Sequence, residues 1–205
     1  MDGGFIQGVS GVILAGGKSS RYGKNKALVS INGLPLIKRV LRVMRPLFSS
    51  IVIITNMPDE YAFLDLPMFE DRIKGLGPLG GILTGLQVIP ENAGFFVACD
   101  MPFLNSDLIR YLASVRQDFD VVVPTFSGKF EALHALYTKN CLPEIELLIR
   151  DGIYQTIRLF QSVDVRYVAE HEIRRFDPQF KSFSNINKPG ELQEMKRKFS
   201  NAITK

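Results

Sequence analysis

The chain has 205 residues, enough for one domain with a substantial buried core, and no linker, repeat or low-complexity segment divides residues 1–205. Apolar residues make up 46% of the sequence and include fifteen Phe, a composition that excludes an intrinsically disordered chain. Lys and Arg exceed Asp and Glu by four (25 against 21), which suits a small anionic ligand better than a nucleic-acid duplex, since a duplex usually needs a broad basic face.

Short apolar runs alternate with longer amphipathic stretches along the chain. Val9–Leu14 is predicted to be a buried strand, because its apolar run ends at Ala15-Gly16-Gly17. Leu36–Phe48 is predicted to be a helix, since its apolar residues recur at helical spacing with basic residues between them. Ser50–Thr55 is a β-branched run of strand length. The remaining predictions are strands at Gly94–Ala98, Asp120–Pro124 and Ala132–Tyr137, and helices at Leu79–Ile89, 106–116, Pro143–Arg150, Gly152–Phe160 and Glu191–Lys198.

This order of elements predicts an α/β fold with a mostly parallel sheet covered by helices on both faces. In such sheets ligands bind beyond the carboxyl ends of the strands, so every loop that follows a strand is a candidate wall of the site. Ser106 is expected to cap the helix that follows it, because serine at that position accepts hydrogen bonds from the first turn.

The loop after the first predicted strand, Leu14–Lys26, has the composition of a phosphate-binding loop. Its glycines let backbone N–H groups approach phosphate oxygens, and Arg21, Lys24 and Lys26 add cationic donors. The loop is neither a Walker P-loop nor a Gly-x-Gly-x-x-Gly dinucleotide fingerprint. The alternative interpretation is an ordinary surface loop with solvated charges.

Within this loop, Leu14-Ala15-Gly16-Gly17 with Arg21-Tyr22-Gly23 and Lys26 resembles the signature of nucleotidyltransferases of the molybdenum-cofactor guanylyltransferase (MobA) type. The resemblance implies a three-layer α/β/α Rossmann-like nucleotidyltransferase (GT-A-like) fold. It also implies that Leu14, Ala15, Gly16, Gly17 and Lys26 bind GTP and that Arg21 and Lys26 are catalytic. Two residues depart from the family pattern: Tyr22 stands where Met is usual, and Asn25 stands where Asp is usual before the lysine.

A second glycine-rich segment, Gly77-Pro78-Leu79-Gly80-Gly81, begins a predicted helix and follows Asp71. Unpaired N–H groups and the positive end of the helix dipole would face an anion there. The segment resembles one that lines the nucleotide pocket of the family, which assigns Gly77, Pro78 and Leu79 to GTP binding and Asp71 to a place near the base and ribose. The alternative is a helix-start turn with proline in its first turn.

Asp100 ends the apolar run Val97-Ala98-Cys99 and is predicted to hold Mg²⁺, because a carboxylate at a strand end beside a triphosphate loop is placed to do so. The Cys-Asp-x-Pro sequence also resembles the metal-binding segment of the family, so Asp100 is assigned to catalysis, to the metal and to GTP. The alternative role of Asp100 is to cap the next turn.

Three further segments match the family more loosely. Asn56, at the end of the second strand, is expected to pair with the purine edge, although a turn residue fits the position as well. His134 is expected to contact the acceptor, with a core histidine as an equal alternative. Asn185 and Asn187 resemble acceptor- or metal-side residues, and an Asn-rich turn is the alternative.

The resemblance therefore implies a Mg²⁺-dependent transfer of GMP from GTP to the terminal phosphate of molybdopterin. Brief contacts with the proteins that deliver and accept the cofactor are also expected. The alternatives are a molybdopterin cytidylyltransferase, another small-acceptor nucleotidyltransferase such as a sugar-1-phosphate enzyme, a nucleotide-binding module without turnover, and a structural subunit.

No apolar run reaches the roughly 18 residues of a membrane span, and the acidic start of the chain does not resemble a signal peptide. Cys99 and Cys141 show no metal-ligand spacing and form no disulfide framework. We therefore expect a cytoplasmic protein that contacts neither membrane nor nucleic acid.

Overall fold

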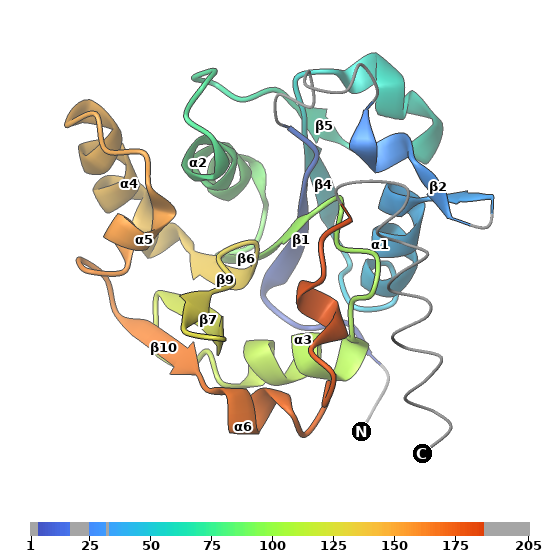
Figure 1. Ribbon diagram of the computed structural model, residues 1–205. Coiled ribbons are helices and arrows are strands. Elements are labelled where there is room, and N and C mark those ends of the chain that lie inside the picture. The colour runs from blue at the N-terminus through green and yellow to red at the C-terminus, as the bar shows by residue number, and fades with distance from the viewer. Residues whose placement is uncertain (1–3, 17–24, 32, 187–205) are drawn as a thin grey trace.

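The computed structural model describes residues 4–16, 25–31 and 33–186 (Figure 1). Within them, an eight-stranded sheet has the strand order β10-β7-β9-β6-β1-β4-β5, and β8 pairs with β7. The strands are β1 (Val9–Leu14), β4 (Ile51–Ile54), β5 (Met68–Phe69), β6 (Ala93–Ala98), β7 (Val121–Phe126), β8 (Lys129–Phe130), β9 (His134–Thr138) and β10 (Val165–Val168). A separate antiparallel pair joins β2 (Ser30–Ile31) to β3 (Leu34–Pro35).

The sheet is mostly parallel, as predicted. β1 pairs in parallel with β4 and β6, β4 with β5, and β7 with β10. β9 runs antiparallel between β6 and β7, and the short β8 turns back against β7. The carboxyl ends of β1, β4, β5 and β6 therefore meet at one edge of the sheet.

Helices cover both faces of the sheet and bury two separate apolar layers (Figure 1). Ile13 and its neighbours on one face pack with α1 (Leu36–Met44) and α3 (Ser106–Ser114). Val12 and Leu14, which alternate with Ile13, pack on the other face with α2 (Pro78–Val88) and α4 (Leu142–Arg150). Alternation along β1 thus divides the core into two layers.

Most predicted elements are present, with bounds that differ by up to a few residues. The helix expected over Gly152–Phe160 is reduced to α5 (Thr156–Leu159), and Glu191–Lys198 lies outside the described residues. The prediction that Ser106 caps α3 is wrong: the N-cap is Asn105, whose Oδ1 accepts a hydrogen bond from the Leu108 N–H at 2.9 Å. Elements not predicted are the short strands β2, β3, β5 and β8, the strand β10, the helix α6 (Glu170–Ile173), and the 3₁₀ segments η2 (Lys26–Leu28), η3 (Pro58–Leu64), η4 (Lys139–Cys141) and η5 (Lys181–Phe183).

α2 is buried along most of its length, with every residue from Leu79 to Leu86 inside the protein. Its glycines allow this close approach: a Cβ added at Gly85 would lie 2.5 Å from Cε1 of Phe96 and 3.0 Å from Cγ1 of Val12. Glycine at position 85 is therefore required by packing on the sheet.

Gly85→Ala should lower the free energy of unfolding by about 1–2 kcal/mol, although alanine favours a helix over glycine by about 1 kcal/mol. Urea denaturation checks this result. In a Phe96→Leu background, where the ring is absent, the same change should cost much less. An equal cost in both backgrounds would contradict the contact with Phe96.

In the part of the chain that the structure describes, no helix combines the length and the apolar character needed to cross a membrane.

Candidate functional site

Four residues assigned to the site lie at equivalent positions past paired strand ends. Register pairs Leu14 with both Ile54 and Ala98, and Ile54 with Phe69. Gly16, Asn56, Asp71 and Asp100 each follow one of these strand ends by two residues. The sheet therefore gathers the glycine-rich loop and the predicted base- and metal-side residues at one edge.

Backbone hydrogen bonds continue this pairing into the loops. The Ala15 N–H donates to the carbonyl of Ile54 at 2.9 Å, and the Cys99 N–H donates to the carbonyl of Leu14 at 3.1 Å. The buried Thr55 hydroxyl donates to the carbonyl of Ala15 at 3.2 Å. The first residues after β1, β4 and β6 are thus held together by the strands themselves.

Asn56 and Asp71 form a reciprocal pair. Nδ2 of Asn56 donates to Oδ2 of Asp71 at 2.8 Å, and the Asp71 N–H donates to Oδ1 of Asn56 at 3.2 Å. A Cβ added at Gly16 would lie 3.7 Å from the same Oδ2, so the glycine-rich loop starts against this carboxylate. Asn56 therefore orients Asp71. The Asn56 amide, expected to pair with a purine edge, already donates one N–H to the Asp71 carboxylate and accepts from the Asp71 backbone N–H.

The second oxygen of Asp71 is the more informative one. Oδ1 is buried and has no hydrogen-bond partner among the described residues. A buried carboxylate oxygen without a donor is costly, so such an atom indicates a place where a ligand supplies the donor. Hydroxyl or N–H groups of a nucleotide are donors of that kind.

The N-terminus of α2 borders the same edge. Gly77 caps the helix with φ +62° and ψ −147°, a conformation that glycine tolerates best, and Pro78 occupies the first turn. A Cβ added at Gly81 would lie 3.1 Å from Cδ2 of Leu14, so the first turns of α2 rest on the end of β1. Gly77 and Pro78 are exposed and available to a ligand, whereas the Leu79 side chain is buried in the core.

Asp100 is half-buried in the turn after β6. Its backbone carbonyl accepts a hydrogen bond from the Ile186 N–H at 3.1 Å, which brings the exposed Asn185 close to the metal-side loop. Ile186 is itself buried and packs with Leu36, Val29 and Phe103. The acceptor-side segment is thereby tied to the loop that carries Asp100, although 85 residues separate them.

Four residues predicted for the site cannot be placed in it. Gly17, Arg21 and Asn187 lie outside the described residues, as does the side chain of Lys26, whose backbone begins η2. Their assigned roles stay predictions.

His134 occupies the core, the alternative given for it above. The ring is fully buried between Phe95 and Phe183, with centroid separations of 5.2 and 5.1 Å. Burial lowers the pKa of His134 to about 3, against a smaller opposing effect of Asp177. Neither ring nitrogen has a hydrogen-bond partner among the described residues. A direct contact between His134 and an acceptor does not fit this arrangement.

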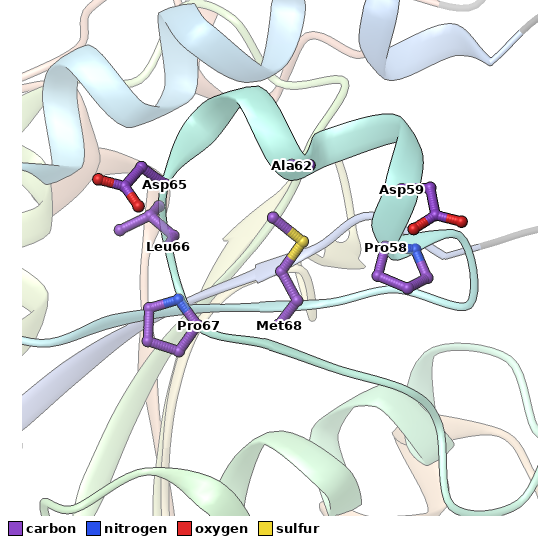
Figure 2. A pocket seen from close by; sticks show the side chains of 7 residues that line it. All are labelled: Pro58, Asp59, Ala62, Asp65, Leu66, Pro67 and Met68. Carbon is purple, nitrogen blue, oxygen red and sulfur yellow. The ribbon is translucent and has the colours of Figure 1, made fainter.

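A shallow pocket lies beside the site elements but contains none of the predicted residues. It is formed between η3 and β5 by Pro58, Asp59, Ala62, Asp65, Leu66, Pro67 and Met68 (Figure 2). The sequence interpretation also missed Tyr61 and Glu60 of η3, which contact the far end of the first loop at Asn25. Neither residue belongs to a recognisable motif.

Comparisons with known proteins identify relatives over most of the chain. A family model described as the MobA-like NTP transferase domain matches residues 11–172. A protein of Carboxydothermus hydrogenoformans named "probable molybdenum cofactor guanylyltransferase" is 35% identical over 197 residues, covering 95% of this chain and 98% of that protein. A molybdenum cofactor guanylyltransferase of Syntrophotalea carbinolica is 31% identical over 190 residues, with 92% and 90% covered.

Solved structures show a similar likeness. Molybdopterin-guanine dinucleotide biosynthesis protein A of Archaeoglobus fulgidus superposes with a TM-score of 0.79 at 26% identity, covering 94% of this chain and 99% of that one. A 4-diphosphocytidyl-2C-methyl-D-erythritol synthase of Anaerococcus prevotii shares the fold, with a TM-score of 0.64 at 14% identity and coverage of 99% of both chains. The expected Rossmann-like nucleotidyltransferase fold is confirmed.

Proposed function

The chain belongs to the MobA-like NTP transferase family, and from that premise we propose that it transfers GMP from GTP to molybdopterin, with or without bound molybdenum. A terminal phosphate oxygen of molybdopterin attacks the α-phosphorus of GTP. The bond from that phosphorus to the oxygen bridging to the β-phosphate breaks, and pyrophosphate leaves. The product is the guanine dinucleotide form of the cofactor.

The observation that carries this proposal is the shared edge of the sheet. Gly16, Asp71 and Asp100 follow the ends of neighbouring paired strands. Asn185 lies close to Asp100, because the N–H of the next residue, Ile186, donates to the Asp100 carbonyl. A nucleotide and an acceptor bound at this edge would therefore meet. A phosphate acceptor is already ionised at neutral pH, so the protein needs to supply position and charge instead of a general base.

Within this scheme Asp71, oriented by Asn56, accepts hydrogen bonds from the nucleoside part of GTP through its unpartnered Oδ1. Gly77 and Pro78 border the nucleotide beside the end of β1. Arg21 and Lys26, from the first loop, neutralise the phosphates, and Asn185 and Asn187 lie on the acceptor side. These roles are proposals that site variants test.

Asp100 is the residue that would hold Mg²⁺. The described residues contain no cluster of three or more His, Cys, Asp or Glu side chains that could hold a metal by itself. Mg²⁺ in nucleotide enzymes is usually bound through one or two carboxylates together with substrate phosphates, so a half-buried carboxylate at this edge fits it. When bound, the metal would reduce the charge on the phosphates during transfer.

We place this reaction in the cytoplasm, the compartment in which thiols such as those of Cys99 and Cys141 stay reduced. Proteins that deliver molybdopterin and accept the dinucleotide are the partners this function implies.

The decisive experiment incubates the purified chain with Mg²⁺, molybdopterin and either GTP or CTP, and measures pyrophosphate release and the dinucleotide formed. Release with GTP and not with CTP is the expected result. Release with CTP alone would overturn the guanylyl assignment and keep the chemistry. Binding of nucleotide without release in either mixture would overturn the proposed reaction.

Asp71→Asn should raise the KM for GTP by roughly tenfold and change kcat little, because it removes a charged acceptor from the nucleoside side of the site. Steady-state kinetics at saturating molybdopterin measures both constants. Asp65→Asn, which changes an exposed carboxylate in the shallow pocket of Figure 2, is the matched control. An unchanged KM for GTP in the Asp71 variant would remove Asp71 from the nucleotide site.

A further inference from the structure

The hydroxyl group of Tyr61 lies between the two residues that flank the glycine- and lysine-rich part of the first loop. Tyr61 belongs to η3 and is only 1% exposed. Its hydroxyl oxygen is 2.7 Å from Nδ2 and 3.0 Å from Oδ1 of Asn25. The same oxygen is 3.5 Å from the carbonyl oxygen of Ala15. One hydroxyl therefore reaches both the end of β1 and the residue before Lys26.

Asn25 is held in a single orientation by its other contacts. Its Nδ2 also donates to Oε2 of Glu60 at 2.6 Å, and its Oδ1 accepts from the Ala27 N–H at 3.0 Å. Rotating the amide by half a turn would place Oδ1 against the Glu60 carboxylate and Nδ2 against the Ala27 N–H, so both contacts would be lost. Asn25 thus fixes the start of η2, whose first residue is Lys26.

Ala15 is the rigid end of this connection. Its N–H and carbonyl are bound by Ile54 and Thr55, both from the β4 edge of the sheet. An Asn25 N–H donating to the Tyr61 oxygen, with the hydroxyl proton directed to Ala15, gives a continuous chain from the loop end to the sheet. Burial raises the pKa of the Tyr61 hydroxyl, so this group stays protonated and able to donate.

We propose that Tyr61 is a positioning residue for nucleotidyl transfer: by joining Ala15 to Asn25, it holds Gly16 and the backbone of Lys26 at a fixed separation beside the nucleotide. This inference rests on the proposed function, since it concerns the same site. Glu60 completes the arrangement by accepting from Asn25. An aspartate at position 25, the usual residue of the resembled family, would here place two carboxylates side by side.

Tyr61→Phe removes the hydroxyl and keeps the buried ring. We expect kcat/KM for GTP to fall roughly tenfold, the size of effect that loss of a buried hydrogen-bonded group produces, while the KM for molybdopterin stays within twofold of the original. Tyr111→Phe is the matched control, because it also removes a tyrosine hydroxyl that is hydrogen-bonded, in this case to the Glu172 carboxylate, away from the site edge. That variant should keep its full activity at a comparable loss of stability.

A second pair of variants tests the connection without touching the ring. Asn25→Asp should lower kcat/KM for GTP about tenfold through repulsion from Glu60, and adding Glu60→Gln should restore most of it, because the new amide can donate to the aspartate. A role in stability alone would not produce this rescue of activity. Absence of rescue, or Tyr61→Phe with kcat/KM within twofold of the original, would overturn the positioning role.

GTP affinity, measured by calorimetric titration of the same variants, separates this inference from the proposed reaction. If the unmodified chain releases no pyrophosphate, the proposed reaction fails, whereas the order of GTP affinities still decides the role of Tyr61. Weaker GTP binding by Tyr61→Phe but not by Tyr111→Phe supports it. Equal GTP affinity in the two variants overturns it.

Discussion

Asp100→Asn should lower kcat by about a hundredfold or more and leave the fold intact. The change keeps the size of the side chain and removes the charge that would hold Mg²⁺ against the phosphates. A charge-stabilising contact at a reacting group is typically worth about 3–4 kcal/mol, which corresponds to a loss of this size. Asp100 is half-buried in a turn after β6, so the exchange should disturb little packing.

The measurement is pyrophosphate release at saturating GTP and molybdopterin, repeated over a range of Mg²⁺ concentrations. The variant should need a higher Mg²⁺ concentration for half-maximal rate as well as reaching a lower maximum. Asp107→Asn changes an exposed carboxylate in the first turn of α3 and should behave like the original chain. A tenfold loss or less for Asp100→Asn, with an unchanged Mg²⁺ requirement, would count against a metal-binding role.

The sequence allowed the central strands to be predicted because they are short apolar runs with abrupt ends. β1, β4 and β6 were each predicted close to their observed bounds, and their carboxyl ends carry Gly16, Asn56 and Asp100. β5 was missed because Met68–Phe69 is too short for a period to be recognised. Missing β5 hid the reason why Asp71 stands opposite Asn56.

The residue types alone did not decide where two of the helices begin and end. Asn105 and Ser106 are both good helix caps, and only the backbone shows that Asn105 adopts the extended conformation of the N-cap while Ser106 is already helical. The stretch Gly152–Phe160 has apolar residues at mixed spacing, and only Thr156–Leu159 is helical. Such boundaries depend on packing that a single sequence does not specify.

The pairs that organise the site join residues far apart in the chain. Fifteen positions separate Asn56 from Asp71, and thirty-six separate Asn25 from Tyr61. A motif identifies residue types and spacing along the chain, whereas these contacts follow from strand register and from the place of η3 beside Asn25. The sequence therefore indicated which loops form the site but not which side chains orient them.

His134 is a residue that a motif suggested for the site but that the fold places in the core. The segment Glu131–Tyr137 resembled an acceptor-side segment, and its single histidine was a natural candidate for a phosphate contact. In the structure, alternation along β9 directs that ring into the core layer shared with Phe95 and Phe183. Position on a strand, and not residue type, decides whether such a histidine reaches a ligand.

Because His134 is buried without a charge, stability should depend on pH below neutrality. The pKa of His134 is lowered to about 3 in the folded chain, whereas an unfolded chain has a histidine pKa near 6.5. Between these values the unfolded state binds a proton that the folded state does not, so the free energy of unfolding falls as pH falls. From pH 8 to pH 5 this histidine alone should remove about 2 kcal/mol.

His134→Phe isolates this effect, since phenylalanine fills the same apolar site between two aromatic rings and does not titrate. Urea unfolding of both proteins from pH 8 to pH 5 should show the variant gaining about 2 kcal/mol relative to the original chain over that range. The other histidine, His171, is exposed on α6, so His171→Gln should leave the pH dependence of the original chain unchanged. Pyrophosphate release by His134→Phe at pH 8 should be near that of the original chain. Two outcomes would contradict this account: a stability difference between the two proteins that stays constant across pH, or a large loss of activity in His134→Phe. Either would favour a role for His134 in acceptor binding.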